Sequence, residues 1–177
     1  MLKRTFILLV AAGVFASSGP PGVSEYELLA KVIPIVLSNV SWPGAVGNRP
    51  LNVAILGGLE FGVWLDRGVG NRTVGGRTVV LRYTSPSRYL KEVAAFDVVF
   101  IDRGEEAALD AILSHLQGRP VLTLGYADGL AQRGVMLNFY FEAGKIRFEA
   151  NPQAIKGAGL SVNSHLLNMA KIVGTAP

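Results

Sequence analysis

The side chains that most often carry chemistry are scarce in this chain. It has no cysteine, so thiolate metal sites, thiol catalysis, disulfides and cysteine redox switching are all excluded. Neither His115 nor His165 has the partner four residues away that a helical zinc site requires. No serine lies in the G-x-S-x-G turn of a hydrolase nucleophile. We therefore expect no catalytic residue and no metal ligand.

Asp102 is the acidic residue whose position most favours a site. It follows the apolar segment 96–101, and α/β proteins often bind ligands where central strands end. Arg103 comes next, however, and a solvent-exposed loop pair explains both residues more simply. Glu60 and Asp66 have no partner at a spacing that indicates acid–base hydrolysis.

Glycines follow the apolar segment 51–56, as they do in dinucleotide-binding proteins. Gly57, Gly58 and Gly62 do not match the G-x-G-x-x-G spacing, and the chain has no P-loop G-K-[ST]. We therefore expect no nucleotide and no other cofactor. The net charge of +4 would fall to +2 if Lys3 and Arg4 were removed, and so small a charge does not indicate nucleic-acid binding.

The amino terminus has the order of a secretion signal. Lys3 and Arg4 precede the apolar residues 6–15, small residues occupy positions 16–18, and Gly-Pro-Pro-Gly follows at 19–22. We expect a signal peptide over 1–18 and an exported, periplasmic domain over 19–177. An uncleaved anchor at the amino terminus is the alternative.

Apolar periodicity predicts the elements that would position any site. Helical spacing is found over 24–37, where Pro34 is expected to kink the helix or end it early, over 105–116, and after a cap at Asn163. Strands are expected at 51–56, 77–83, 96–101 and 121–124, followed by a hairpin of 135–141 and 145–150. This order predicts a single α/β domain. Its mixed sheet would have a parallel core, a C-terminal antiparallel hairpin and helices on both faces.

The C-terminal third carries the most specific motif. Residues 146–151 read Ile-Arg-Phe-Glu-Ala-Asn, residues 158–160 read Ala-Gly-Leu, and residues 163–167 read Asn-Ser-His-Leu-Leu. This order resembles that of the YfiR family, which carries IRFEIN, AGL and a serine pair before LL. Upstream, Trp42-Pro43 and the segments 53–57 and 96–101 fall where the family has matching pieces, so the resemblance covers nearly all of 19–177.

The resemblance implies a periplasmic, often dimeric regulator without catalytic residues. The best-known member restrains an inner-membrane diguanylate cyclase through the periplasmic part of that enzyme, which lowers cyclic-di-GMP signalling and biofilm formation. It also has cysteine pairs linked to redox sensing, and this chain has none to match them. The alternative function is a periplasmic small-ligand sensory or solute-binding domain that acts on a different membrane partner. An exported enzyme of unrecognised type ranks third.

Five residues are our candidates for binding a partner or a small ligand. Strand ends and helix N-termini can hold a polar group, and exposed tryptophans often anchor interfaces. The candidates are Trp42, Glu149, Asn151, Ser161 and Asn163. Core packing is the competing explanation for Trp42, and helix capping is the competing explanation for Asn151 and Asn163.

Overall fold

The computed structural model describes residues 24–44, 49–70, 72–92 and 95–174, so the predicted signal peptide lies outside the described residues. The helices are α1 (Glu25–Ser38), α2 (Leu59–Val69), α3 (Pro86–Glu92), α4 (Leu109–Leu116), α5 (Pro152–Gly157) and α6 (Ser164–Asn168), with a 3-10 turn at Glu106–Ala108. The strands are β1 (Val40–Ser41), β2 (Leu51–Leu56), β3 (Thr73–Val74), β4 (Arg77–Thr84), β5 (Val98–Ile101), β6 (Leu122–Gly125), β7 (Leu137–Glu142), β8 (Lys145–Ala150), β9 (Ser161–Val162) and β10 (Lys171–Ile172).

Eight strands form one mixed sheet in the order β10-β8-β7-β6-β5-β2-β4-β3. Neighbouring strands from β4 to β7 run parallel, whereas β8 pairs antiparallel with β7 and β3 pairs antiparallel with β4. Strands β1 and β9 form a separate antiparallel pair. The predicted parallel core and C-terminal hairpin are therefore confirmed.

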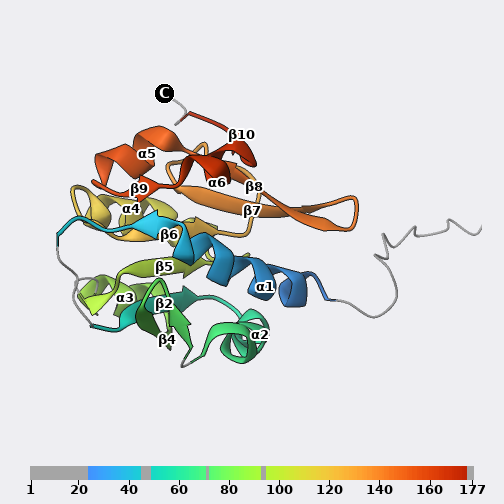
Figure 1. Ribbon diagram of the computed structural model, residues 1–177. Coiled ribbons are helices and arrows are strands. Elements are labelled where there is room, and N and C mark those ends of the chain that lie inside the picture. Colours follow the sequence, from blue (N-terminus) through green and yellow to red (C-terminus); the bar gives the residue numbers. More distant parts are fainter. Residues whose placement is uncertain (1–23, 45–48, 71, 93–94, 175–177) are drawn as a thin grey trace, which may run out of the picture.

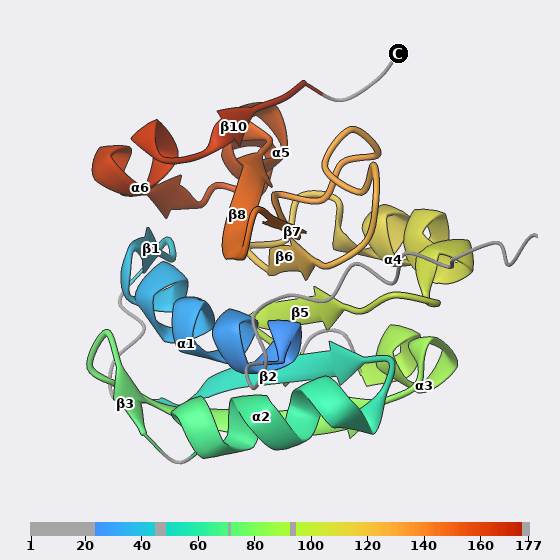
Figure 2. The same cartoon turned by 90° about the vertical axis from the view of Figure 1, so that its right-hand side faces the viewer.

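Both faces of the central strands are covered, which explains why these segments are almost wholly apolar. Alternate residues of β5 enter two different cores: Val98 and Phe100 pack with α1 and α2, and Val99 and Ile101 pack with α3 and α4. The two views of the molecule show the same arrangement, with α1 and α2 on one side of the sheet and α3 and α4 on the other (Figures 1 and 2).

Helix α1 begins where its sequence predicts but does not stop at its proline. The Ser24 hydroxyl accepts a hydrogen bond from the Tyr26 N–H and caps the helix. The helix continues past Pro34 to Ser38, so the expectation of an early end is wrong. Ile33, Val36 and Leu37 are buried, and their packing outweighs the single backbone hydrogen bond that a proline removes.

The C-terminal segment differs from its predicted form. The apolar spacing suggests a final helix reaching Val173, whereas α6 ends at Asn168 and is followed by the edge strand β10. Strand β10 pairs parallel with β8, and the Val173 N–H donates to the carbonyl of Ala150. Two residues of pairing are too short to leave a period-2 pattern in the sequence.

Candidate functional site

The site lies at the carboxyl edge of the sheet, between β2 and β5. From β2 the chain crosses through α2 to β4 on one side, and from β5 it continues through α4 to β6 on the other. Such a reversal of strand order opens a crevice in α/β sheets, and ligands commonly bind there. Gly57 follows β2 and Asp102 follows β5, so both residues lie at this switch point of the sheet.

Asp102 is buried at this edge of the sheet, with 2% of its surface exposed. The Tyr26 hydroxyl lies 3.0 and 3.2 Å from its two carboxylate oxygens, and the Arg103 N–H donates to Oδ1 over 2.8 Å. Burial raises the pKa of Asp102 above its ordinary value, although hydrogen bonds from Arg103, Tyr26 and Gly58 act against this. The expected solvent-exposed pair with Arg103 is therefore wrong for Asp102.

The close approach of β2 and β5 explains the glycine at position 57. A Cβ atom there would lie 2.5 Å from the Cβ of Asp102, which is closer than two carbons can approach. Gly57 also has φ of +121°, a conformation that side chains disfavour. The glycine therefore allows the Asp102 side chain to occupy this position.

Arg103 points the other way, into a three-residue contact that we call the Arg103 clamp: Glu25, Arg103 and Tyr126. The guanidinium lies 2.9 Å from Glu25 Oε2 and 4.1 Å from the centre of the Tyr126 ring, and the Tyr126 hydroxyl also donates to Glu25. The hydrogen bond from Tyr126 lowers the pKa of Glu25 against the effect of burial, and Arg103 adds to the lowering. The clamp attaches the first turn of α1 to the ends of β5 and β6.

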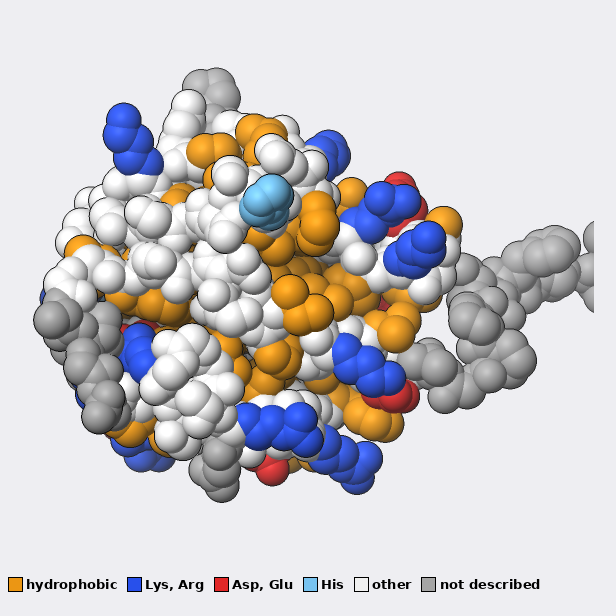
Figure 3. All heavy atoms as spheres, viewed as in Figure 1, with side chains coloured by type: hydrophobic (Ala, Val, Ile, Leu, Met, Phe, Trp, Pro, Cys, Tyr) orange, Lys and Arg blue, Asp and Glu red, His pale blue; other side chains and the backbone are white. Residues whose placement is uncertain are grey.

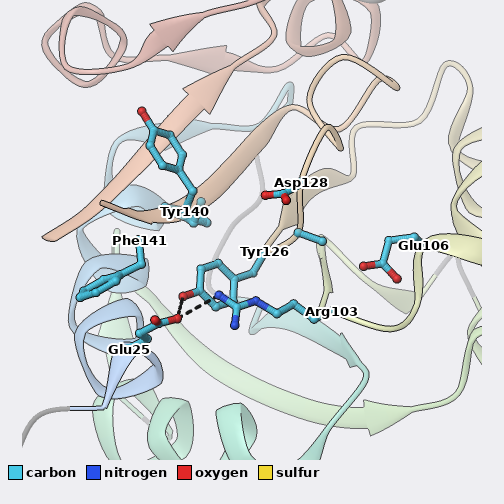
Figure 4. Close-up of a pocket in the computed structure, with 9 residues that line it drawn as sticks. Glu25, Arg103, Glu106, Tyr126, Asp128, Tyr140 and Phe141 are labelled. Atoms are coloured by element: carbon cyan, nitrogen blue, oxygen red, sulfur yellow. Dashed lines mark hydrogen bonds and ion pairs between the residues drawn. The ribbon is translucent and has the colours of Figure 1, made fainter. Parts of the chain in front are cut away.

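A pocket of about 440 Å³ lies beside the clamp (Figure 4). That volume is within the range of small-ligand sites. The clamp residues form one part of its lining together with Ala127, and Glu106 and Asp128 lie across the pocket from Glu25. The remaining lining is residues 139–141 of β7.

The charges around this pocket do not balance. Glu25 and Arg103 pair with each other, whereas the carboxylates of Glu106 and Asp128 have no ion pair or hydrogen bond within the described parts of the chain. The pocket therefore carries net negative charge on one wall and aromatic surface on another. Such a lining can bind a cationic or polar group, and it offers no nucleophile beside a base.

Two of the predicted candidate residues are buried inside the fold. Glu149 is 7% exposed and accepts hydrogen bonds from Gln132, Asn138 and Lys171. Asn151 is fully buried, caps α5 through the Ala154 N–H and donates to the carbonyl of Ala131.

The other three predicted candidates lie nearer the surface. Ser161 and Asn163 are exposed and line a polar pocket of about 250 Å³ beside the β1–β9 pair, and Asn163 caps α6. Trp42 is half-buried, its Nε1 donates to the Asp97 carbonyl over 3.3 Å, and Arg77 lies over its ring. None of the five residues lines the pocket beside the Arg103 clamp. Their role in binding stays a prediction.

Sequence reasoning reached Asp102 but missed Tyr26, Arg103 and Tyr126. The sequence did contain a signal for Arg103 and Tyr126. Asp102–Arg103 follow β5 and Tyr126 follows β6, and the carboxyl ends of neighbouring parallel strands lie at the same edge of a sheet. Nothing in the local sequence of α1 indicated that its first turn reaches this edge. His115 hydrogen-bonds the Ala111 carbonyl on the exposed side of α4 and lies outside this pocket, as does Asp102 itself.

The family model of YfiR/HmsC-like proteins matches residues 26–171, which include Asp102, the hairpin and two of the three clamp residues, Arg103 and Tyr126. The chain belongs to the YfiR/HmsC-like family. This is a family of periplasmic, regulatory proteins that interact with a membrane-associated partner, and it is not a catalytic family. Among the described residues of this YfiR/HmsC-like chain, no helix is long and apolar enough to cross a membrane.

The fold has a counterpart among solved structures. A conserved domain protein from Vibrio cholerae O1 biovar El Tor superposes with a TM-score of 0.61 at 12% sequence identity. The match covers 85% of this chain and 60% of the Vibrio chain, so the present sequence spans less than two thirds of that protein. At this identity the likeness supports the fold alone. No curated protein matches the chain.

Proposed function

We propose that the protein is a periplasmic regulator that restrains a membrane diguanylate cyclase by binding the periplasmic part of that enzyme. The observation that carries the proposal is the family match over residues 26–171. Restraint of the cyclase would lower cyclic-di-GMP and with it biofilm formation. Export through the predicted signal peptide and a homodimeric state belong to the same proposal.

The chemistry of the carboxyl edge supports binding rather than turnover. Asp102 is buried beneath Tyr26, and its carboxylate has all of its near contacts inside the protein. Glu25 and Arg103 neutralise each other. A catalytic acid or base must reach the proton that it transfers, and neither arrangement offers this without rearrangement.

A small-ligand sensory domain is the second candidate function, and the pocket beside the Arg103 clamp favours it. A ligand in this pocket would contact both α1 and the ends of β5 and β6, because Glu25, Arg103 and Tyr126 all line it. Binding there could change how firmly α1 is held. The two candidates are compatible, since a ligand can act through a changed affinity for a partner.

The direct test is a pull-down of the purified mature protein against the periplasmic domain of a membrane diguanylate cyclase from the same organism, together with cyclic-di-GMP measurements in a deletion strain. Capture of the domain, with raised cyclic-di-GMP in the deletion strain, is the expected result. Unchanged cyclic-di-GMP and no capture would reject restraint of a cyclase and favour a different membrane partner. Light scattering of the same sample measures the oligomeric state.

On the exposed face that surrounds α1, apolar side chains gather between the hairpin and α2 (Figure 3). Contiguous apolar surface of this kind often marks contact with another protein. It supports the proposal of a protein-binding role without identifying the partner.

A further inference from the structure

The edge of β7 that faces the pocket is only partly paired. Strand β7 pairs with β8 along all six residues from Leu137 to Glu142, but its other neighbour, β6, pairs only with Leu137 and Asn138. Figure 1 shows the β7–β8 hairpin reaching well past the end of the parallel strands. No described strand pairs with β7 on this side beyond Asn138, and Phe139 is buried, so the open sheet edge is residues 140–142.

The register identifies which backbone groups face this edge. The hairpin has a two-residue turn, Ala143-Gly144, with both residues at positive φ, so the flanking pair Glu142–Lys145 is hydrogen-bonded. Hydrogen-bonded pairs then alternate along the ladder, and the Asn151 N–H bond to the Met136 carbonyl fits that alternation. Consequently, the N–H and C=O groups of Phe139 and Phe141 point away from β8. The β6–β7 ladder ends with Gly125 opposite Asn138, which places the Phe139 N–H beside Gly125, and Phe139 is buried. Phe141 is therefore the residue whose backbone groups face the open edge.

Phe139 and Phe141 also line the pocket. Beyond the ladders with β6 and β8, the structure records no backbone hydrogen bond to Phe141 from the described parts of the chain. An extended strand bound to such an edge gains main-chain hydrogen bonds, and pockets for its alternate side chains give specificity. The open edge and the pocket are thus two parts of one surface.

The charge of the pocket selects the side chain of such a strand. Across the pocket from the Arg103 clamp, Glu106 and Asp128 present carboxylates without a partner among the described residues. A lysine or arginine of an added strand would supply the missing counter-charge. An acidic side chain would be repelled by both carboxylates.

We propose that the open edge of β7 at residues 140–142 binds an extended peptide segment of a partner protein, whose basic side chain enters the pocket toward Glu106 and Asp128. This inference rests on the proposed function for the identity of the partner, but not for the existence of the site. It specifies the mode of contact as strand addition and the chemistry of the segment as basic.

The test uses the mature protein purified from the periplasm and fluorescein-labelled peptides, with binding followed by fluorescence anisotropy. The probe is the pentapeptide Val-Lys-Val-Lys-Val. One control peptide replaces lysine by glutamate, and a second replaces the two outer valines by proline to remove backbone donors. We expect the probe to bind at least about tenfold more tightly than either control peptide.

The matching protein variants are Asp128→Lys, in the pocket, and Asp66→Lys, which makes the same charge change on the exposed surface of α2. Asp128→Lys should weaken probe binding about tenfold, and Asp66→Lys should leave it within about twofold. Glu106→Lys provides a second pocket variant should Asp128→Lys fold poorly.

Three results would overturn the inference: no binding of the probe, equal binding of the probe and the proline peptide, or equal binding by wild type and both pocket variants. The peptide measurement requires no cyclase, so it can fail while cyclase capture succeeds. In that case the regulator binds its partner through a different surface. The reverse outcome, probe binding without cyclase capture, would support the site and reject the proposed partner.

Discussion

The Tyr26 hydroxyl bonds both carboxylate oxygens of Asp102, at 3.0 and 3.2 Å, although the two residues are 76 positions apart. This contact joins the first turn of α1 to the carboxyl end of β5. It satisfies a buried carboxylate that would otherwise lack a side-chain donor. The free energy of unfolding should therefore depend on the Tyr26 hydroxyl.

We expect Tyr26→Phe to lower the free energy of unfolding by about 1–3 kcal/mol at pH 7, because a buried carboxylate loses a donor. Urea denaturation measures the loss. Tyr83→Phe is the matched control, since the Tyr83 hydroxyl donates to the Gly62 carbonyl and its side chain is 45% exposed. It should cost less than about 1 kcal/mol. Equal costs for the two variants would contradict the importance of Asp102.

The cost of Tyr26→Phe should also depend on pH. Burial raises the pKa of Asp102 above its ordinary 3.8, so the folded protein binds this proton more tightly than the unfolded chain. Ionisation of Asp102 therefore reduces stability as pH rises through the folded pKa. Loss of the phenol raises that pKa further, so the cost should shrink as pH falls from 7 toward 4. A cost independent of pH would show that Asp102 is not the affected group.

The Arg103 clamp should make a smaller contribution. We expect Arg103→Gln to lower stability by about 1 kcal/mol, since both charged side chains are partly exposed and water screens them. The pKa of Glu25 is lowered from 4.5, so its stabilisation is present above that pH and is lost as pH falls through the folded pKa. Thermal denaturation at pH 7 and pH 3.5 should show the larger effect at pH 7. Arg88→Gln, in an exposed helical pair with Glu92, is the control and should have little effect.

Gly57→Ala tests the packing of β2 against β5. An added Cβ atom would meet the Cβ of Asp102 at 2.5 Å and would also be strained at φ of +121°. We expect a loss of roughly 2–4 kcal/mol, measured by chemical denaturation. Gly75→Ala shares the positive φ but has open space around it, and should cost only about 1 kcal/mol. Similar losses at both positions would mean that backbone strain alone explains the glycine.

Glu149 should act by holding β10 in the sheet. Glu149→Ala removes the acceptor of Lys171 and one of the two acceptors of the Asn138 amide. We expect a loss of about 2 kcal/mol and faster amide exchange in Lys171–Ile172. Glu142→Ala is the control in the same hairpin, because Glu142 is exposed and pairs with exposed Arg147. If amide exchange in β10 were unchanged, Glu149 would not hold this strand, and direct binding of a partner by Glu149 would be the better explanation.

Export can be checked independently of any partner. We expect protein recovered from the periplasm to begin near residue 19, because small residues at 16–18 follow the apolar segment. Intact-mass measurement of the recovered protein identifies its first residue. A full-length mass in the membrane fraction would instead support an uncleaved anchor.

The central strands could be predicted from sequence because their consecutive residues are all apolar, as burial on both faces requires. The segment Val98–Ile101 is apolar throughout, and the turn Ala143-Gly144 separates two clear strands. The pocket could not be predicted in the same way. Its lining joins Glu25 to Tyr126 across 101 positions, and no local pattern records a contact that depends on how α1 packs over the sheet.

Asn151 and Glu149 show that a motif recognised in the sequence can be assigned the wrong role. Both belong to the motif that carries the family resemblance, and both are buried in hydrogen bonds within the fold. A specific motif can therefore reflect how a hairpin passes into a helix rather than where a partner binds. Sequence similarity of this kind does not separate the two roles, because both need polar residues at fixed spacing.

The bonds from Glu25 and Tyr26 also bear on the order of assembly. If the chain is exported from its amino end as proposed, α1 emerges first, whereas two groups that bond its first turn, Asp102 and Tyr126, emerge much later. Until then the first turn of α1 lacks these contacts, and long-range closure of this kind slows folding. A chain that must remain unstructured during passage through a membrane would gain from such a delay.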